Sequence, residues 1–194
     1  TITLADNATA LTAMENSAIV CQVTPAGLLR FSGEDSPSFL HGQLSSDVKA
    51  LSENSAQYSS YSTPKGRMLA SFLLFRQQGD YWLQLSNELV SAMQKRLSMF
   101  IMRSKTRCID ATSERALIGL AGPRAEAIAQ QITGIAPGTE LSVLHAEEYS
   151  LVSLPGKRFQ FVAMPDSAPR LWQQLVQAGC TPASVPTATW APAV

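Results

Sequence analysis

Two short stretches that occur twice in the chain decide the predicted fold. The first is Phe31-Ser32-Gly33-Glu34, which matches Leu120-Ala121-Gly122-Pro123; each copy leads into a predicted helix. The second is Gly79–Leu85, which matches Gly156–Val162; each copy again leads into a helix. The two matches are spaced slightly differently along the chain. The sequence therefore predicts a duplicated unit of strand, helix, strands and helix, in which each copy keeps its own loop lengths.

The pattern of apolar residues predicts the elements of both units. Strands are expected at 18–23, 28–32, 57–62, 67–75, 81–85, 116–120, 149–154 and 159–164. Helices are expected to begin at Asp35 or Ser36, Asn87, Gly122 and Asp166, with Asp35 or Ser36 as the N-cap of the first. Residues 1–17 are small and polar without a period, which is typical of a flexible N-terminus. We therefore expect a flexible segment 1–17, a first half at 18–113 and a second half at 114–194.

Two related halves of this kind are expected to pack about an approximate two-fold axis, with a ligand cleft between them. The alternative is that two generic α+β units look alike only because strands and helices alternate in both. Either way, the predicted fold class is α+β.

Composition restricts the class of protein. The chain has 194 residues, 45% of them hydrophobic, and 15 Lys and Arg residues balance 15 Asp and Glu residues. A zero net charge gives no overall attraction to nucleic acid or to an anionic membrane. The longest nearly unbroken apolar run, Met68–Phe75, has eight residues, whereas a membrane-spanning helix needs about 20. We therefore expect a soluble protein that binds neither nucleic acid directly nor a membrane.

Cysteine and histidine usage gives no metal or redox motif. Cys21, Cys108 and Cys180 lie far apart in the sequence, so no pair has the close spacing of zinc or redox sites. His41 and His145 are isolated. The motifs of serine hydrolases, phosphate-binding loops and dinucleotide-binding folds do not occur in the sequence. These observations favour a protein of the reducing cytoplasm, and they leave no catalytic residue to assign.

Basic residues are concentrated in one part of the chain. The segment 65–107 holds eight of the 15 basic residues and two acidic ones, a formal charge of +6. Such a segment attracts a phosphate, a carboxylate tail or an acidic protein surface. The two basic residues of the predicted helix 87–100 are equally well explained as its solvated face. Pro64–Arg67 and Arg103–Lys105 lie at predicted element boundaries, where Gly66 lets a ligand approach the backbone, so they are the candidate anion-binding residues.

Four segments resemble the YgfZ proteins, which are folate-binding relatives of the glycine-cleavage T-protein, an aminomethyltransferase. These segments are Phe31–Val48, Thr63–Ser71, Phe100–Lys105 and Leu120–Pro123, in collinear order within about residues 18–190. The resemblance implies a T-protein-like folate-binding domain, built of duplicated units around a pseudo-two-fold cleft, with tetrahydrofolate as its ligand. It also implies a role in tRNA modification and in the maintenance of iron–sulfur enzymes, which would be partner proteins.

The resemblance implies particular folate contacts. Trp190 falls where these relatives place a tryptophan against the ligand. Ala26 falls where they place a second tryptophan, so one half of an aromatic clamp is missing. The glutamate tail of the folate would be attracted by cations of the two candidate segments. The implied binding residues are Lys65, Gly66, Arg67, Arg103, Lys105 and Trp190.

Two departures from the family pattern bear on activity. The aminomethyltransferases carry a pair of aspartates at the positions of Leu69 and Ala70, so general acid–base catalysis is not available there and aminomethyl transfer is disfavoured. The Lys-Gly-Cys run that bears the functional cysteine of YgfZ proteins does not occur in the 194 residues, which predicts the N-terminal portion of a longer protein.

Two alternative functions stay open at this point. One is a folate-dependent one-carbon transferase that takes its carboxylate from Glu34, Asp35 or Asp47, the nearest acidic residues in the sequence. The other is a protein-binding module whose basic segment docks an acidic partner while the cleft stays empty.

Overall fold

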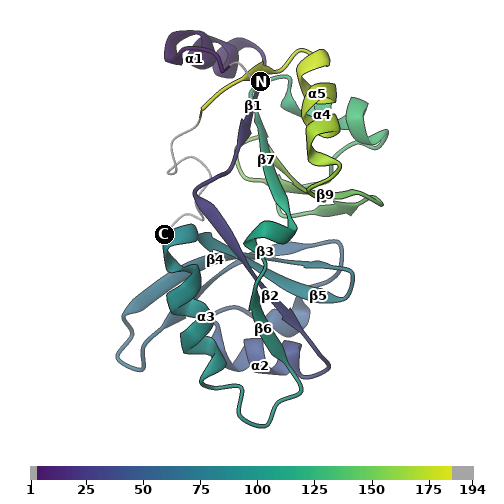
Figure 1. Ribbon diagram of the computed structural model, residues 1–194. Helices are drawn as coiled ribbons and strands as arrows, with labels where there is room; N and C mark the ends of the chain where they lie inside the picture. Colours follow the sequence, from purple (N-terminus) through teal and green to yellow (C-terminus); the bar gives the residue numbers. More distant parts are fainter. Residues whose placement is uncertain (1–3, 185–194) are drawn as a thin grey trace. The chain divides into compact units, whose positions relative to one another are not determined.

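The computed structural model describes residues 4–184, which form two compact units. One unit consists of residues 24–113, and the other consists of residues 4–23 and 114–184 (Figure 1). Each unit contains one β-sheet with helices packed against one of its faces. The fold class is therefore α+β, as the sequence predicts.

The unit of residues 24–113 is built around a five-stranded antiparallel sheet with the order β3-β4-β5-β2-β6. Its strands are β2 (Ala26–Ser32), β3 (Ala56–Ser62), β4 (Met68–Gln77), β5 (Asp80–Ser86) and β6 (Arg107–Asp110). Its helices are α2 (Ser36–Gln43), α3 (Val90–Ser98) and the short 3-10 helices η1 (Val48–Ala50) and η2 (Asn87–Leu89). Leu83 of the sheet, Leu40 of α2 and Leu97 of α3 share one buried apolar cluster, so both helices cover the same face.

The other unit contains a six-stranded sheet with the order β11-β1-β7-β10-β9-β8. Its strands are β1 (Ile19–Gln22), β7 (Ala116–Ala121), β8 (Val143–His145), β9 (Tyr149–Leu154), β10 (Arg158–Ala163) and β11 (Thr181–Pro182). Its helices are α1 (Asn7–Asn16), α4 (Ala125–Thr133) and α5 (Ala168–Gln177), and the 3-10 helix η3 (Thr112–Glu114) precedes β7. Ile128 of α4 and Leu175 of α5 pack with Phe161 of the sheet in one apolar cluster.

The two sheets repeat one pattern of strand pairing. Phe31 of β2 pairs with Tyr81 of β5, and Leu120 of β7 pairs with Phe159 of β10. All four side chains are buried in the apolar cluster of their own unit. Tyr81 is therefore equivalent to Phe159, whereas the sequence match places it opposite Arg158 and is wrong by one position. The difference matters because such a shift moves every side chain of a strand to the other face of the sheet.

The helices that follow these strands repeat the same pattern. Met93 and Leu97 are buried residues of α3, and Leu171 and Leu175 are buried residues of α5. Both pairs belong to the apolar cluster of their own unit, and they follow Tyr81 and Phe159 at the same spacing. The duplication predicted from the sequence is thus confirmed in strand pairing and helix packing, and the register of its second match is corrected by one position.

A glycine with positive φ follows β2 and β7, the equivalent strands of the two repeats, and permits a close backbone contact. Gly33 has φ +113° and Gly122 has φ +120°, values that residues with a Cβ atom rarely adopt. A Cβ atom on Gly33 would overlap the carbonyl oxygen of Lys105, and one on Gly122 would overlap that of Ser17. The contacted segments lead into β6 and β1, the strands next to β2 and β7. The two glycines therefore allow the same chain crossing in both units.

The N-terminal part of the chain differs from the sequence prediction. Residues 7–16 form α1 where we expect no regular structure, and the Asp6 carboxylate begins this helix by accepting a hydrogen bond from the Thr9 N–H at 2.9 Å. None of the residues of α1 is buried, which explains why no apolar period marks the helix. Strand β1, expected within the first half, pairs with β7 in the sheet of the other unit. Strands β6, β8 and β11 have only two to four residues, too few for a recognisable alternation.

Candidate functional site

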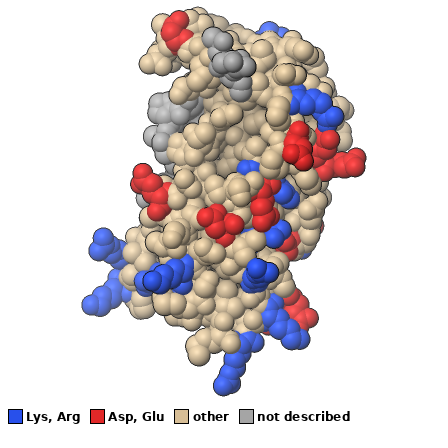
Figure 2. Space-filling view, in the orientation of Figure 1, with Lys and Arg blue, Asp and Glu red and all other residues tan. Residues whose placement is uncertain are grey.

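The two units carry net charges of opposite sign, which add up to the zero net charge of the chain. The unit of residues 24–113 carries ten basic and seven acidic residues, whereas the other carries five basic and eight acidic residues. We therefore call residues 24–113 the basic unit. Figure 2 shows that Lys and Arg side chains project from several separate places on the visible surface and do not form one continuous patch. The candidate cations therefore have to be considered place by place.

The first candidate group lies in the hairpin turn Thr63–Arg67, which joins β3 to β4. The Gly66 N–H donates to the Thr63 carbonyl, and the Thr63 N–H donates to the Arg67 carbonyl, both at 2.8 Å. Pro64 at the second turn position and Gly66 with φ +79° are residues that such a hairpin loop favours. The turn itself thus requires Gly66, and the side chains of Lys65 and Arg67 are exposed on either side of it.

The second candidate group lies in the loop that leads from α3 to β6. The Lys105 N–H donates to the Asp35 carboxylate at 2.7 Å, and the Lys105 carbonyl accepts from the Asp35 N–H at 3.3 Å. The Lys105 ammonium also pairs with the Glu34 carboxylate at 2.6 Å. Arg103 is exposed, and its side chain forms no hydrogen bond or ion pair within residues 4–184. Lys105 is therefore paired with a carboxylate, whereas Arg103 is not.

Asp35 occupies the N-cap position of α2, one of the two residues that the sequence predicts there, but its side chain makes no hydrogen bond to that helix. It binds the loop 70 residues later in the chain instead. The sequence offers Glu34 and Asp35 only as carboxylates for catalysis and does not reveal their contacts with this loop, because nothing in the local pattern indicates a partner so far away.

The register of the sheet keeps the two candidate groups apart. The turn adjoins Met68, the first residue of β4. The loop adjoins Arg107, the first residue of β6, and pairing through β2 and β5 places Arg107 at the level of Gln77, the last residue of β4. The length of β4 from its first to its last residue is roughly 30 Å, at about 3.3 Å per residue. The turn and the loop therefore cannot hold the same carboxylate.

Two further arginines of the basic segment pack on the protein. Arg76 forms an ion pair with Glu53 at 2.6 Å, and its guanidinium lies 5.1 Å from the centre of the Tyr81 ring. Arg96 of α3 donates to the Tyr61 hydroxyl at 3.2 Å and lies over that ring at 5.5 Å. The interpretation of the basic helix face as solvated is thus wrong for Arg96, which makes a cation–π contact.

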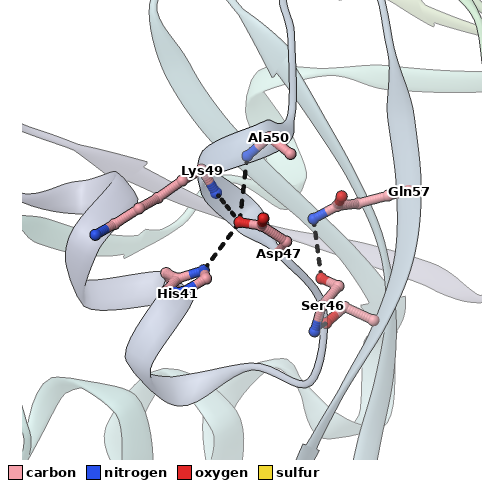
Figure 3. Close-up of polar contacts among 7 residues, drawn as sticks. His41, Ser46, Asp47, Lys49, Ala50 and Gln57 are labelled. Atoms are coloured by element: carbon pink, nitrogen blue, oxygen red, sulfur yellow. Dashed lines mark hydrogen bonds and ion pairs between the residues drawn. The ribbon is translucent and has the colours of Figure 1, made fainter.

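Asp47, one of the three carboxylates considered for acid–base chemistry, has a structural role at the end of the α2 segment (Figure 3). Its Oδ1 accepts from the N–H groups of Lys49 at 3.1 Å and Ala50 at 3.3 Å, which caps η1. The same oxygen lies 3.2 Å from Nδ1 of His41. The other two candidate carboxylates hold the loop before β6. Each of the three carboxylates therefore already binds another group of the basic unit.

The positions of the family's aspartate pair are packing positions in this chain. Ala70 is 4% exposed and belongs to the apolar cluster beneath α2 and α3. Leu69 is partly buried and packs against the same cluster. Neither position supplies a group that could hold or transfer a proton.

The thiols of Cys108 and Cys180 are not activated. Burial raises the pKa of Cys108 and of Cys180 to about 12, against an ordinary value near 9.

Within residues 4–184, no three His, Cys, Asp or Glu side chains gather as a metal site would require. In the same part of the chain, no helix has the length and apolar character needed to cross a bilayer.

The expected aromatic contact cannot be placed. Trp190 lies outside the described residues. Ala26, at the position of the second tryptophan of the relatives, is the half-buried first residue of β2. Three large apolar side chains of the loop between α3 and β6 are exposed: Met99 (59%), Phe100 (49%) and Met102 (85%).

The architecture defines a known structural class. It matches the glycine cleavage system aminomethyltransferase T from Bartonella henselae with a TM-score of 0.75 at 18% identity, over 87% of this chain and 48% of that one. It also matches a chain of the heterotetrameric sarcosine oxidase from Corynebacterium with a TM-score of 0.57 at 12% identity, over 96% and 93% of the two chains. The fold is therefore that of the T-protein class, as expected from the sequence.

The particular family follows from the sequence comparisons. Residues 5–155 match the GCVT N-terminal domain family, and the chain belongs to that family. It is 30% identical over 139 residues to the tRNA-modifying protein YgfZ of Hamiltonella defensa, which covers 71% of this chain and 41% of the relative. It is 25% identical over 181 residues to an aminomethyltransferase of Desulfitobacterium hafniense, which covers 86% and 48%. The chain spans about half the length of the curated relatives it matches.

Proposed function

We propose that this chain binds tetrahydrofolate and serves as a cytoplasmic accessory factor in tRNA modification and in the maintenance of iron–sulfur enzymes. Membership of the GCVT N-terminal domain family and similarity to YgfZ proteins support the proposal. The observation that carries it is a fold of the T-protein class in which Leu69 and Ala70 are apolar packing residues. A fold that lacks acid groups at these positions favours ligand binding over one-carbon transfer.

The proposed ligand has a flat ring system and an anionic glutamate tail, and different residues would meet each part. Lys65 and Arg67 in the hairpin turn, or Arg103 and Lys105 in the loop before β6, would attract the tail through charge. Trp190 would contact the ring, since aromatic stacking adds about 0.5–1.5 kcal/mol to the burial of a ring. Because the turn and the loop lie at opposite ends of β4, a single tail would engage only one of the two groups.

Isothermal titration with tetrahydrofolate under reducing, anaerobic conditions tests binding. We expect saturable heat and one ligand per chain. The double variant Lys65→Glu, Arg67→Glu and the single variant Arg103→Glu identify the group that attracts the tail, because charge reversal at that group alone weakens binding. Lys157→Glu reverses an exposed cation of the other unit and is the matched control. Absence of saturable binding at millimolar ligand would overturn the proposal.

A folate-dependent one-carbon transferase is the competing function, because aminomethyltransferases are among the relatives. Such an enzyme needs a carboxylate near the folate nitrogen, and Glu34, Asp35 and Asp47 each bind a neighbouring loop or helix end. Incubation with methylenetetrahydrofolate and an amine acceptor distinguishes the two functions. Our proposal expects folate to be bound and recovered unchanged, whereas turnover would favour the transferase.

The role in tRNA modification is tested in cells. A bacterial host from which its own YgfZ gene has been deleted is supplied with this chain, and the modified nucleosides of its tRNA are measured by mass spectrometry. Because the Lys-Gly-Cys run does not occur in these 194 residues, we expect the nucleosides to be restored when the chain is fused to the part of the host's YgfZ protein that carries this run. If charge reversal of Lys65 and Arg67 abolishes restoration while folate binding is retained, the basic segment docks an acidic protein partner instead.

A further inference from the structure

The loop before β6 is held more firmly than its exposure would suggest. Both backbone groups of Lys105 bind Asp35, the N–H to the carboxylate at 2.7 Å and the carbonyl to the Asp35 N–H at 3.3 Å. The next residue adds a contact, since the Thr106 hydroxyl lies 2.6 Å from that of Ser36. Gly33 leaves the space in which the Lys105 carbonyl sits. The start of α2 thus fixes the end of the loop.

The duplicated unit serves as an internal control for this arrangement. At the equivalent crossing, the Arg124 N–H donates to the Ser17 carbonyl at 3.0 Å, and Gly122 makes the same room for it. Residues 123 and 124, which correspond to Glu34 and Asp35, are proline and arginine, so no carboxylate is available there. The crossing itself therefore does not need the two acids. They are specific to the copy that carries the cationic loop.

The two carboxylates act on the loop in different ways. Asp35 accepts from a backbone N–H, which fixes the path of the chain. Glu34 pairs with the Lys105 ammonium at 2.6 Å and offsets its charge. Arg103, two residues earlier, is exposed, and no carboxylate among residues 4–184 pairs with it. The loop thus presents one compensated cation and one uncompensated cation.

We infer that Asp35 and Glu34 are positioning residues, which hold this loop so that Arg103 offers its charge to a carboxylate of the bound ligand while Lys105 is withheld. The inference rests on the proposed function, and it deepens that proposal by selecting the loop rather than the hairpin turn as the place of the tail. A planar guanidinium matches a carboxylate in two parallel hydrogen bonds, which an ammonium cannot do.

The ligand arm of the test compares tetrahydrofolate with its triglutamate form at low ionic strength. The measured quantity is the ratio of their dissociation constants, which isolates the contribution of the two additional glutamates from that of the ring and the first glutamate. We expect Arg103→Gln to reduce the preference for the triglutamate by up to about fivefold, the upper end for an exposed ion pair, because low ionic strength leaves the pair unscreened. We expect Glu34→Gln to increase the preference by a similar factor, because it releases the Lys105 charge. Lys95→Gln on α3, an exposed cation outside both groups, is the matched control.

The positioning arm measures amide hydrogen exchange at Lys105 by NMR, which needs no ligand, and then repeats the comparison of the two folates in the same variants. We expect Asp35→Ala to speed exchange at least tenfold and to lower the triglutamate preference as Arg103→Gln does. Asp35→Asn keeps an oxygen that can accept the bond, so it should restore both quantities to within about threefold of the wild type. Asp47→Ala removes a carboxylate of the same kind elsewhere in the basic unit and should leave Lys105 unchanged.

The outcomes separate this inference from the proposed function. If the wild-type chain binds neither folate, the proposed function fails, and the ligand part of the inference fails with it. The amide exchange rate of Lys105 in Asp35→Ala then decides by itself whether Asp35 positions the loop. If both folates bind, an unchanged or lower triglutamate preference in Glu34→Gln overturns the inference. Asp35→Ala with wild-type exchange and wild-type preference overturns it as well.

Discussion

Replacing Gly33 by alanine should destabilise the basic unit by roughly 2–5 kcal/mol, as the sum of two effects. The φ of +113° costs a residue with a Cβ atom about 1–2 kcal/mol. The new Cβ would also overlap the Lys105 carbonyl, so the loop has to move away from α2. That movement breaks the two hydrogen bonds between Lys105 and Asp35, each worth about 0.5–1.5 kcal/mol. The sum is a large part of a typical domain stability of about 5–15 kcal/mol.

Urea unfolding followed by circular dichroism measures this loss, with two matched alanine variants beside it. Gly66 has φ +79°, but a Cβ there would meet nothing within 4 Å, so Gly66→Ala should cost only about 1 kcal/mol. Gly122 repeats the crowded crossing, so Gly122→Ala should cost clearly more than Gly66→Ala. The reasoning is refuted if Gly33→Ala costs no more than Gly66→Ala.

Three further outcomes are expected from the packing of the two units. Ala70→Asp, which places an aspartate where the aminomethyltransferases carry one, should lower the free energy of unfolding in urea by about 3 kcal/mol or more, because it buries a carboxylate in an apolar cluster. A variant as stable as the wild type would contradict the packing described. Leu97→Ala and Leu175→Ala should each cost about 2.7–5 kcal/mol, since both fully buried side chains occupy equivalent places in the repeat; a loss in one variant alone would speak against equivalence. Cys108 and Cys180 should resist iodoacetamide at pH 8 until urea is added, because their thiol pKa values of about 12 exceed the ordinary value near 9. For the same reason the free energy of unfolding should fall from pH 9 towards pH 12, where the unfolded chain loses these protons first; rapid labelling of the native protein would contradict the burial.

Sequence patterns predict the long elements well because each buries several apolar side chains. The β-favouring run Tyr149–Leu154, which is buried on both faces, predicts β9 with its observed bounds. The stripe of Met93 and Leu97 likewise predicts α3. Helix α1 escapes prediction because it buries no side chain and therefore leaves no period to detect. The second repeat match is wrong by one position because it aligns glycines, whereas the register is fixed by the side chains that face the helices.

The candidate site is less predictable because its organisation depends on contacts between distant residues. Charge and position identify the cationic segments Pro64–Arg67 and Arg103–Lys105, but a linear sequence does not show that a whole strand length separates them. The partners of Lys105 are also invisible in the sequence, because Glu34 and Asp35 lie far away in the chain. The role of Gly66, by contrast, can be predicted from the sequence alone, because the local turn motif Thr63–Arg67 explains why a glycine stands there.

Amide chemical-shift mapping during a titration with tetrahydrofolate tests the central claim most directly. We expect shift changes that saturate as ligand is added and that include the amides of Arg103 and Lys105, with a single dissociation constant for all of them. Spectra that stay unchanged up to millimolar tetrahydrofolate would contradict the claim that this chain binds folate.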